Sequence, residues 1–133
     1  SLLWRLFKAR DMDAVILQEN IEGLLSLVRM LLPGEGSAGH VYLDDLSALQ
    51  QSIHEQINDL YSQRGETPEQ DATLCLAILQ GYNVSMYANP EDEDRKRSVL
   101  QRSLTLLDVL PPSLLKQQLS AVCHGMQELC ETN

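Results

Sequence analysis

Apolar residues recur along much of the chain at spacings of three and four, which is the period of an amphipathic helix. The first such pattern occupies residues 17–32. The second starts near Asp44 or Asp45, whose carboxylates can cap a first helical turn, and it continues to Leu60. We therefore predict two helices in the amino-terminal half, joined by a glycine-rich loop at 33–40.

Three further helices are predicted from their start signals. Thr67 and Asn89 each precede a proline, which favours a cap followed by the first helical residue, and Ser113 can cap the last helix. The predicted ranges are 68–87, 90–110 and 115–129. No strand-like alternation longer than a few residues occurs. The fold class is therefore predicted to be all-α, a compact bundle of about five helices with mostly antiparallel neighbours.

Domain organisation follows from the same pattern. Residues 13–133 are expected to form a single helical domain, since the length suits one modest core. Residues 1–12 form an amino-terminal extension, predicted to be a short amphipathic helix with basic side chains between apolar ones. Packing of this extension on the acidic body is the more common outcome for such a segment, ahead of contact with a membrane surface or a partner groove.

The helix predicted at 68–87 is expected to be the central one, because it has two packing sides. Ala77, Gly81 and Ser85 form a low ridge that another helix can approach closely. Tyr82 supplies a large apolar body with a hydroxyl group to satisfy. Asn83 falls on the apolar stripe, which predicts a buried amide that either bonds a neighbouring loop or anchors a ligand or partner.

Charge narrows the classes of partner. The formal net charge of −9 argues against direct nucleic-acid binding and favours a basic protein partner. Within residues 90–97, acid-before-base pairs four residues apart predict a solvated helix face. No membrane-length apolar run or signal peptide is apparent, and an odd number of cysteines indicates reduced core thiols. A soluble, cytoplasmic protein is expected.

The search for reactive groups predicts no catalytic residues, no metal site and no cofactor. His54 begins an H-E-x-x-H-like run, but Asn58 replaces the second histidine. Cys123, His124 and Cys130 match no common zinc spacing. No phosphate-cradling glycine motif is present. The sequence therefore indicates a protein that is not an enzyme.

Several pieces of sequence together resemble one family. They are the LCLA run, the GYN triplet at 81–83 and the segment LDVLPPSLLKQQL. With the pattern before Thr67, these resemble the UpxZ family of transcription antiterminator antagonists, encoded in capsular polysaccharide loci, over roughly residues 17–119. The resemblance implies a non-enzymatic regulator that blocks noncognate NusG-like antitermination factors and so limits expression of other capsular polysaccharide operons.

An acidic bundle can meet the basic surface of such a factor, with aromatic side chains as anchors. The candidate partner-binding residues are Asp44, Asp45, Tyr61, Glu66, Glu69, Asp71, Tyr82, Asn83 and Tyr87. The structural alternative is that the tyrosines belong to the core and the acids cap helices.

Two other functions stay open. A helical ligand-binding or enzymatic domain predicts a polar pocket near Asn83. A structural dimerisation module predicts an exposed apolar stripe along Leu114 to Leu129, closed by a second copy in a homodimer.

Overall fold

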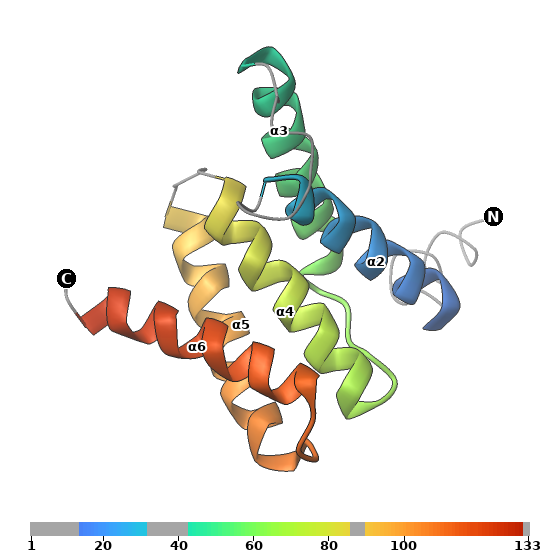
Figure 1. Cartoon of the computed structure of the whole chain (residues 1–133), viewed down its shortest axis with the longest axis vertical. Coiled ribbons are helices and arrows are strands. Elements are labelled where there is room, and N and C mark those ends of the chain that lie inside the picture. The colour runs from blue at the N-terminus through green and yellow to red at the C-terminus, as the bar shows by residue number, and fades with distance from the viewer. Residues whose placement is uncertain (1–13, 32–42, 86–89, 132–133) are drawn as a thin grey trace.

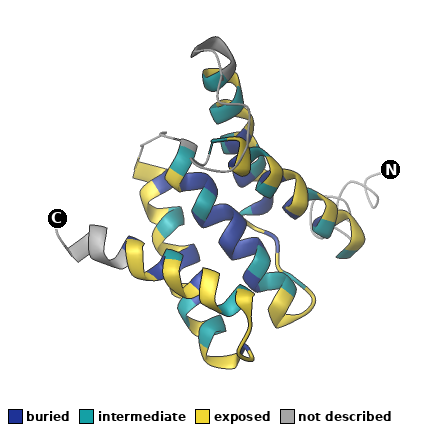
Figure 2. Ribbon diagram, in the orientation of Figure 1, coloured by how far each residue is buried: buried dark blue, intermediate teal, exposed yellow. Residues whose placement is uncertain are grey.

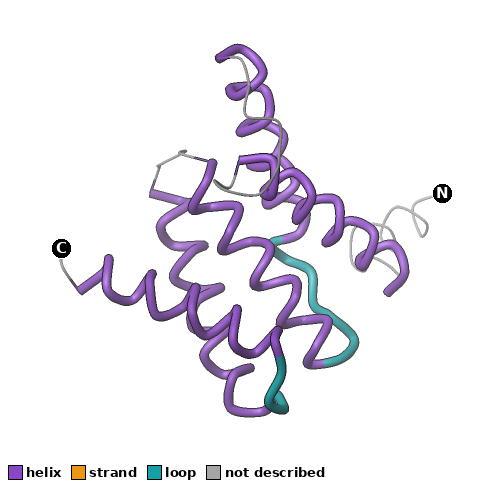
Figure 3. Tube along the Cα trace, in the orientation of Figure 1, coloured by secondary structure: helices purple, strands orange, loops and turns teal. Residues whose placement is uncertain are grey.

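The structure is a computed structural model that describes residues 14–31, 43–85 and 90–131. It describes the side chains in these ranges except at 43–45, 85 and 127–131. The predicted extension 1–12 and the predicted loop 33–40 lie outside the described residues. Every regular element in the described ranges is a helix, which confirms the all-α prediction (Figure 3).

The described chain forms five helices in the predicted order (Figure 1). They are α2 (Ala14–Leu31), α3 (Leu43–Leu60), α4 (Pro68–Ser85), α5 (Pro90–Val109) and α6 (Leu114–Glu131). Two of the predicted caps are formed. Thr67 Oγ1 accepts a hydrogen bond from the Gln70 amide at 3.0 Å, and Ser113 Oγ accepts one from the Lys116 amide at 3.1 Å. Local sequence signals thus define where α4 and α6 begin.

Helix α4 is the centre of the fold. It contacts α2, α3, α5 and α6, whereas α2 otherwise contacts only α3 and α6 otherwise contacts only α5 among the described helices. In Figure 1, α4 and α5 lie side by side and antiparallel, and α6 crosses α5 obliquely. The middle of α4 is buried on all sides, as Figure 2 shows. Two helix pairs therefore flank one apolar helix.

Gly81 lies where α3 crosses α4 closely, as its position on the low ridge predicted. A Cβ atom on Gly81 would lie 2.7 Å from Ile57 Cδ1 and 3.3 Å from Ile53 Cγ2. Both isoleucines are fully buried. The missing side chain therefore lets two β-branched residues of α3 reach the backbone of α4.

The predicted burial of Asn83 is wrong. Its side chain is exposed, although Leu79, one turn earlier on the same stripe, is fully buried. The rest of this last turn is covered, since Tyr82 is buried and the Val84 carbonyl oxygen accepts a hydrogen bond from Gln50 Nε2 of α3 at 3.2 Å, so Asn83 lies at the uncovered edge of the turn. An exposed amide needs no internal partner, so Asn83 is not a fixed point of the core.

The apolar stripe of α6 that was predicted to form a dimer contact is mostly buried inside the protein itself. Leu119, Cys123 and Met126 of α6 are buried against the body of the protein. Leu114 alone among the described large apolar side chains of α6 is strongly exposed. The apolar side of α6 therefore completes the core, and the dimer alternative loses the surface on which it was based.

Candidate partner interface

The connection between α3 and α4 is held by the first turn of α4. Gln70 reaches back over the turn, and its Oε1 accepts a hydrogen bond from the Glu66 amide at 2.9 Å. Together with the Thr67 cap this resembles a capping box, with the Glu66 amide in place of the Thr67 amide. The side-chain amide of Gln70 also donates to the Ala14 carbonyl oxygen of α2 at 3.0 Å. The turn is thus attached to α2 as well as to α4.

Gly65 lies so close to α4 that no side chain fits there. Its amide donates to Asp71 Oδ1 at 2.9 Å. A Cβ atom would lie 2.3 Å from the Asp71 nitrogen and 2.7 Å from the Gln70 carbonyl carbon. These backbone atoms cannot rotate away, so the position requires glycine. Gly65 therefore lets the chain that leads into α4 pack against the first turn of that helix.

Arg102 of α5 attaches the same turn to the other side of the fold. Its Nε donates to Asp71 Oδ2 at 3.3 Å, and its Nη2 donates to Asp71 Oδ1 and, at 3.1 Å, to the Gln63 carbonyl oxygen. The Arg102 and Asp71 side chains are each only 14% exposed. Removing either side chain would leave the charge of the other largely desolvated and unpaired by a counter-ion. Such a change would destabilise the folded protein. Asp71 is therefore engaged within the protein.

Glu66 and Glu69 remain exposed at this connection. Neither forms an ion pair among the described residues. Several basic side chains are instead bound to other groups of the protein: Arg95 to Asn58, Lys96 to Glu93, Arg102 to Asp71, and Lys116 to the Leu110 carbonyl. We call residues 61–69 the acidic turn, since its two exposed glutamates outnumber its one basic residue, Arg64, whose Nη1 donates to the Gln63 carbonyl oxygen at 3.0 Å. Its carboxylates are available to a basic partner.

Helices α3 and α5 run parallel on two sides of α4. Their backbones do not approach each other closely, and the contacts between them are made by side chains. His54 Nε2 lies 3.1 Å from both carboxylate oxygens of Asp92, which is only 1% exposed. One turn further on, Arg95 Nη1 donates to Asn58 Oδ1. His54 therefore joins α3 to α5 through the buried carboxylate of Asp92.

The predicted ion pairs between residues four apart on α5 are wrong, because the observed pairs join other residues. Lys96 pairs with Glu93 at 3.2 Å, three residues away, and Arg97 lies 3.9 Å from Asp94. Asp92 turns inward to α3 instead of forming the predicted pair with Lys96. Solvated pairs on a helix surface contribute little, so partners supplied by a neighbouring helix decide the conformation.

The two described candidate tyrosines differ in exposure. Tyr61, at the start of the acidic turn, is half-buried under Arg95, whose guanidinium carbon lies 5.2 Å from the ring centroid. Tyr82 is 3% exposed, and Lys96 Nζ lies 5.7 Å from its ring centroid. Burial, followed by the charge of Asp92, raises the pKa of Tyr82 to about 12. Tyr82 is thus a core residue, and Tyr61 is the aromatic side chain within reach of a partner.

The Tyr82 hydroxyl is buried, and none of the described residues forms a hydrogen bond with it. Arg95 lies close enough to oppose part of the rise in the pKa of Tyr82, but it does not satisfy the hydroxyl. The sequence predicted that this group would need a partner, and the described part of the chain does not provide one.

The remaining candidates are placed as follows. The side chains of Asp44 and Asp45, and the whole of Tyr87, lie outside the described residues. Asn83 is exposed on the last turn of α4, away from the start of that helix where Glu69 lies. The structure therefore gathers Tyr61, Glu66 and Glu69 at one connection and does not add Asn83 to them.

Arg102 is the residue that sequence reasoning missed. It follows Val99 by three residues and precedes Ser103, and both of these are buried. A cation on the buried side of a helix requires an anionic partner, so this spacing carried a usable signal. The identity of that partner, Asp71, depends on how α4 and α5 pack.

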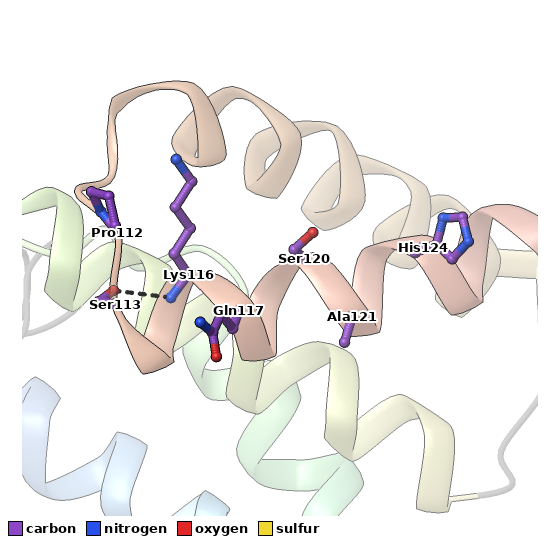
Figure 4. A pocket seen from close by; sticks show the side chains of 7 residues that line it. All are labelled: Pro112, Ser113, Lys116, Gln117, Ser120, Ala121 and His124. Carbon is purple, nitrogen blue, oxygen red and sulfur yellow. Dashed lines mark hydrogen bonds between the residues drawn. The ribbon is translucent and has the colours of Figure 1, made fainter.

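An open pocket of about 540 Å³ lies on the outer face of α6 (Figure 4). Its lining residues are Pro112, Ser113, Lys116, Gln117, Ser120, Ala121 and His124. None of them belongs to α4, so this is not the pocket that the ligand-binding alternative predicted near Asn83. We call this surface the α6 face.

The described side chains give little indication of a metal-binding site or of a reactive cysteine thiol. No group of three or more His, Cys, Asp and Glu residues there could hold a metal ion. Cys75 and Cys123 are buried free thiols, as predicted, and burial raises the pKa of each above its ordinary value. None of the helices described is both long and apolar enough to cross a membrane.

Comparison with known proteins supports a regulatory role. The model of the UpxZ family of transcription anti-terminator antagonists matches residues 21–125. A crystal structure of a transcription anti-terminator antagonist UpxZ from Bacteroides uniformis shares 28% sequence identity, covers 86% of this chain and 79% of its own, and superimposes with a TM-score of 0.62. A search of curated proteins found no match. The family match spans most of the chain, and the chain therefore belongs to the UpxZ family of transcription anti-terminator antagonists.

Proposed function

We propose that this protein binds and inhibits noncognate NusG-like transcription antitermination factors, and so limits expression of other capsular polysaccharide operons. Family membership supports the antagonist role. The acidic turn supports a basic partner, because its two glutamates are exposed and unpaired among the described residues. Inhibition by occupation of a surface requires no catalytic group.

The observation that carries this proposal is the fixed conformation of the acidic turn. A factor that contacts RNA polymerase and nucleic acid presents basic surface, which carboxylates can occupy. Most surface connections lose conformational freedom on binding, and that loss weakens affinity. Here Gln70, Asp71 and Arg102 already hold the chain in place. The backbone of the turn is therefore already ordered before a partner binds, and binding costs little conformational entropy.

Tyr61 adds the apolar part of the proposed contact. Its ring is held by Arg95 next to the turn, and it remains partly exposed. Partly exposed aromatic side chains beside charged rims are common centres of protein interfaces. Glu66 and Glu69 then supply electrostatic steering around an aromatic contact.

The test is a calorimetric titration of this protein against cognate and noncognate NusG-like factors at low and high salt. We expect saturable binding to noncognate factors that weakens with salt, because opposite charges are screened. The double variant Glu66→Gln with Glu69→Gln should weaken binding by about tenfold at low salt, through loss of two peripheral charge contacts.

The matched control is Glu19→Gln with Glu22→Gln, which removes two exposed charges from α2 instead. If both double variants weaken binding equally, net charge acts rather than the acidic turn. If no factor binds at either salt concentration, the proposed function is wrong. The described residues contain no observation that favours the ligand-binding alternative over this one.

A further inference from the structure

We propose that the α6 face is the contact surface of a homodimer, occupied by the α6 face of a second copy of this chain. This surface is distinct from the predicted stripe at Leu114–Leu129, most of which is buried. It lies on the opposite, solvent-facing side of the same helix, where the open pocket is found.

Exposed apolar side chains adjoin the pocket. Val109 is 63% exposed and Leu114 is 69% exposed, and they lie on either side of the turn that begins the α6 face. Pro111 and Pro112 between them are exposed as well. The other large exposed apolar side chains lie on α2, at its two ends, next to segments outside the described residues. Nothing described covers Val109 and Leu114, so this corner is available to a partner.

Charge identifies a second copy as the occupant. Two molecules that each carry a net charge of −9 repel one another over most of their surfaces. The segment 109–127 contains no Asp or Glu, although the chain has 19 acidic residues. The described residues that line the pocket likewise include no carboxylate. Two copies can therefore approach through this face without bringing acidic side chains together.

The size and order of the lining residues suit a symmetric contact. Ser113, Ser120 and Ala121 are small and exposed, which allows a second helix to approach closely. In an antiparallel α6 pair crossing near Gln117, Leu114 of one copy would lie over the region of Ala121 in the other. The reverse contact follows from the two-fold axis. The apolar corner of each copy thus covers the shallow pocket of its mate.

The acidic turn shares no residue with the α6 face. Dimerisation and partner binding are therefore separable, and this inference does not rest on the proposed function. The two associations should also respond to salt in opposite directions. Salt screens the repulsion between acidic copies and strengthens the dimer, whereas it weakens an acidic surface bound to a basic partner.

The test is sedimentation equilibrium of the full chain over a range of protein concentrations at low and high salt. One helix pair makes a small contact, so we expect a reversible dimer with Kd on the order of 10 μM at moderate salt. Raising the salt concentration should lower this Kd. A chain that stays monomeric throughout, up to several hundred μM, overturns the proposal.

Substitutions locate the surface. Ser120→Glu places two like charges near the proposed axis and should raise Kd by at least about tenfold. Leu114→Glu should do the same, and an acid in the first turn of α6 is compatible with the helix. Both positions are exposed, so circular dichroism melting should show an intact fold.

Ser52→Glu is the matched control, since Ser52 is exposed on α3, a helix that does not contact α6. It adds the same charge to each copy and should change Kd much less. If Ser52→Glu weakens the dimer as much as Ser120→Glu does, total charge is responsible and the α6 face is not the contact. If wild-type dimers form but neither α6 variant alters them, the contact lies elsewhere.

Discussion

The α3–α4 turn and the α5–α6 turn begin their helices in the same way and differ in everything that surrounds the cap. Thr67 and Ser113 each accept a hydrogen bond from the amide three residues later. Around Thr67, side chains from α4 and α5 and a carbonyl group of α2 converge on the chain. Around Ser113, the described side-chain contact is Lys116 Nζ with the Leu110 carbonyl oxygen at 3.2 Å.

This difference separates two tasks that a turn performs. A cap starts a helix and needs only local sequence, so both turns have one. Placing a surface accurately relative to the core requires contacts from other helices, and the α3–α4 turn has these. The first turn presents two exposed carboxylates on a backbone that other helices hold in place, whereas the second presents apolar residues and no acid. The comparison predicts that disruption of each turn has very different consequences.

The largest expected effect is at Arg102. Arg102→Met should lower the free energy of unfolding by about 2–4 kcal/mol, because Asp71 would keep its charge in a largely buried site with only the Gly65 amide as a donor and no cation beside it. Lys116→Met, the matched change at the other turn, should cost at most about 1 kcal/mol, since it removes one contact at the end of a helix. Urea unfolding at low protein concentration measures both.

Equal losses for these two variants would contradict the comparison. A small loss for Arg102→Met would mean that Asp71 finds solvent once its partner is removed. Asp71→Asn with Arg102→Met, measured in the same assay, distinguishes the cases. If the buried charge is responsible, the double variant should be more stable than Arg102→Met alone.

Gly65 of the α3–α4 turn and Gly125 within α6 differ in the space that a side chain would find. Gly65→Ala should cost about 1–3 kcal/mol, because its Cβ would overlap backbone atoms of Gln70 and Asp71. Gly125→Ala in α6 has no heavy atom within 4 Å of its Cβ and should stabilise the protein by about 0.5–1 kcal/mol, the ordinary gain of alanine over glycine in a helix. Thermal unfolding of both variants shows directly whether each substitution stabilises or destabilises the protein. A stabilised Gly65→Ala variant would show that the turn can move away from α4.

The sequence predicted the helices well because their signals are local. Thr67 and Ser113 act as caps within one turn of the chain, and the period of apolar residues records which side of each helix is buried. Gly81 was informative for a related reason. A glycine on a low ridge, in a helix that is otherwise strongly apolar, indicates a close crossing, and α3 provides it.

Contacts between helices could not be read in the same way. Asp92 has a basic residue four positions later in the sequence, but His54 of α3 supplies its observed partner. Asn83 continues an apolar stripe, yet its side chain is exposed while that of the adjacent Tyr82 is buried. Glu66 and Glu69 were identified as candidates from charge alone. The cross-helix anchoring that makes them a fixed surface depends on Arg102, which local patterns do not pair with Asp71.

The smallest expected effects are at the caps themselves, and they test where the difference between the turns originates. Thr67→Ala and Ser113→Ala each remove one side-chain acceptor, so each should cost about 1 kcal/mol in urea unfolding. Equal losses would show that the α3–α4 turn owes its fixed conformation to Gln70, Asp71 and Arg102 rather than to a stronger cap. A much larger loss for Thr67→Ala would instead mean that the cap and the cross-helix contacts form together. Combining Thr67→Ala with Arg102→Met resolves this, because independent contacts give additive losses and a cooperative unit does not.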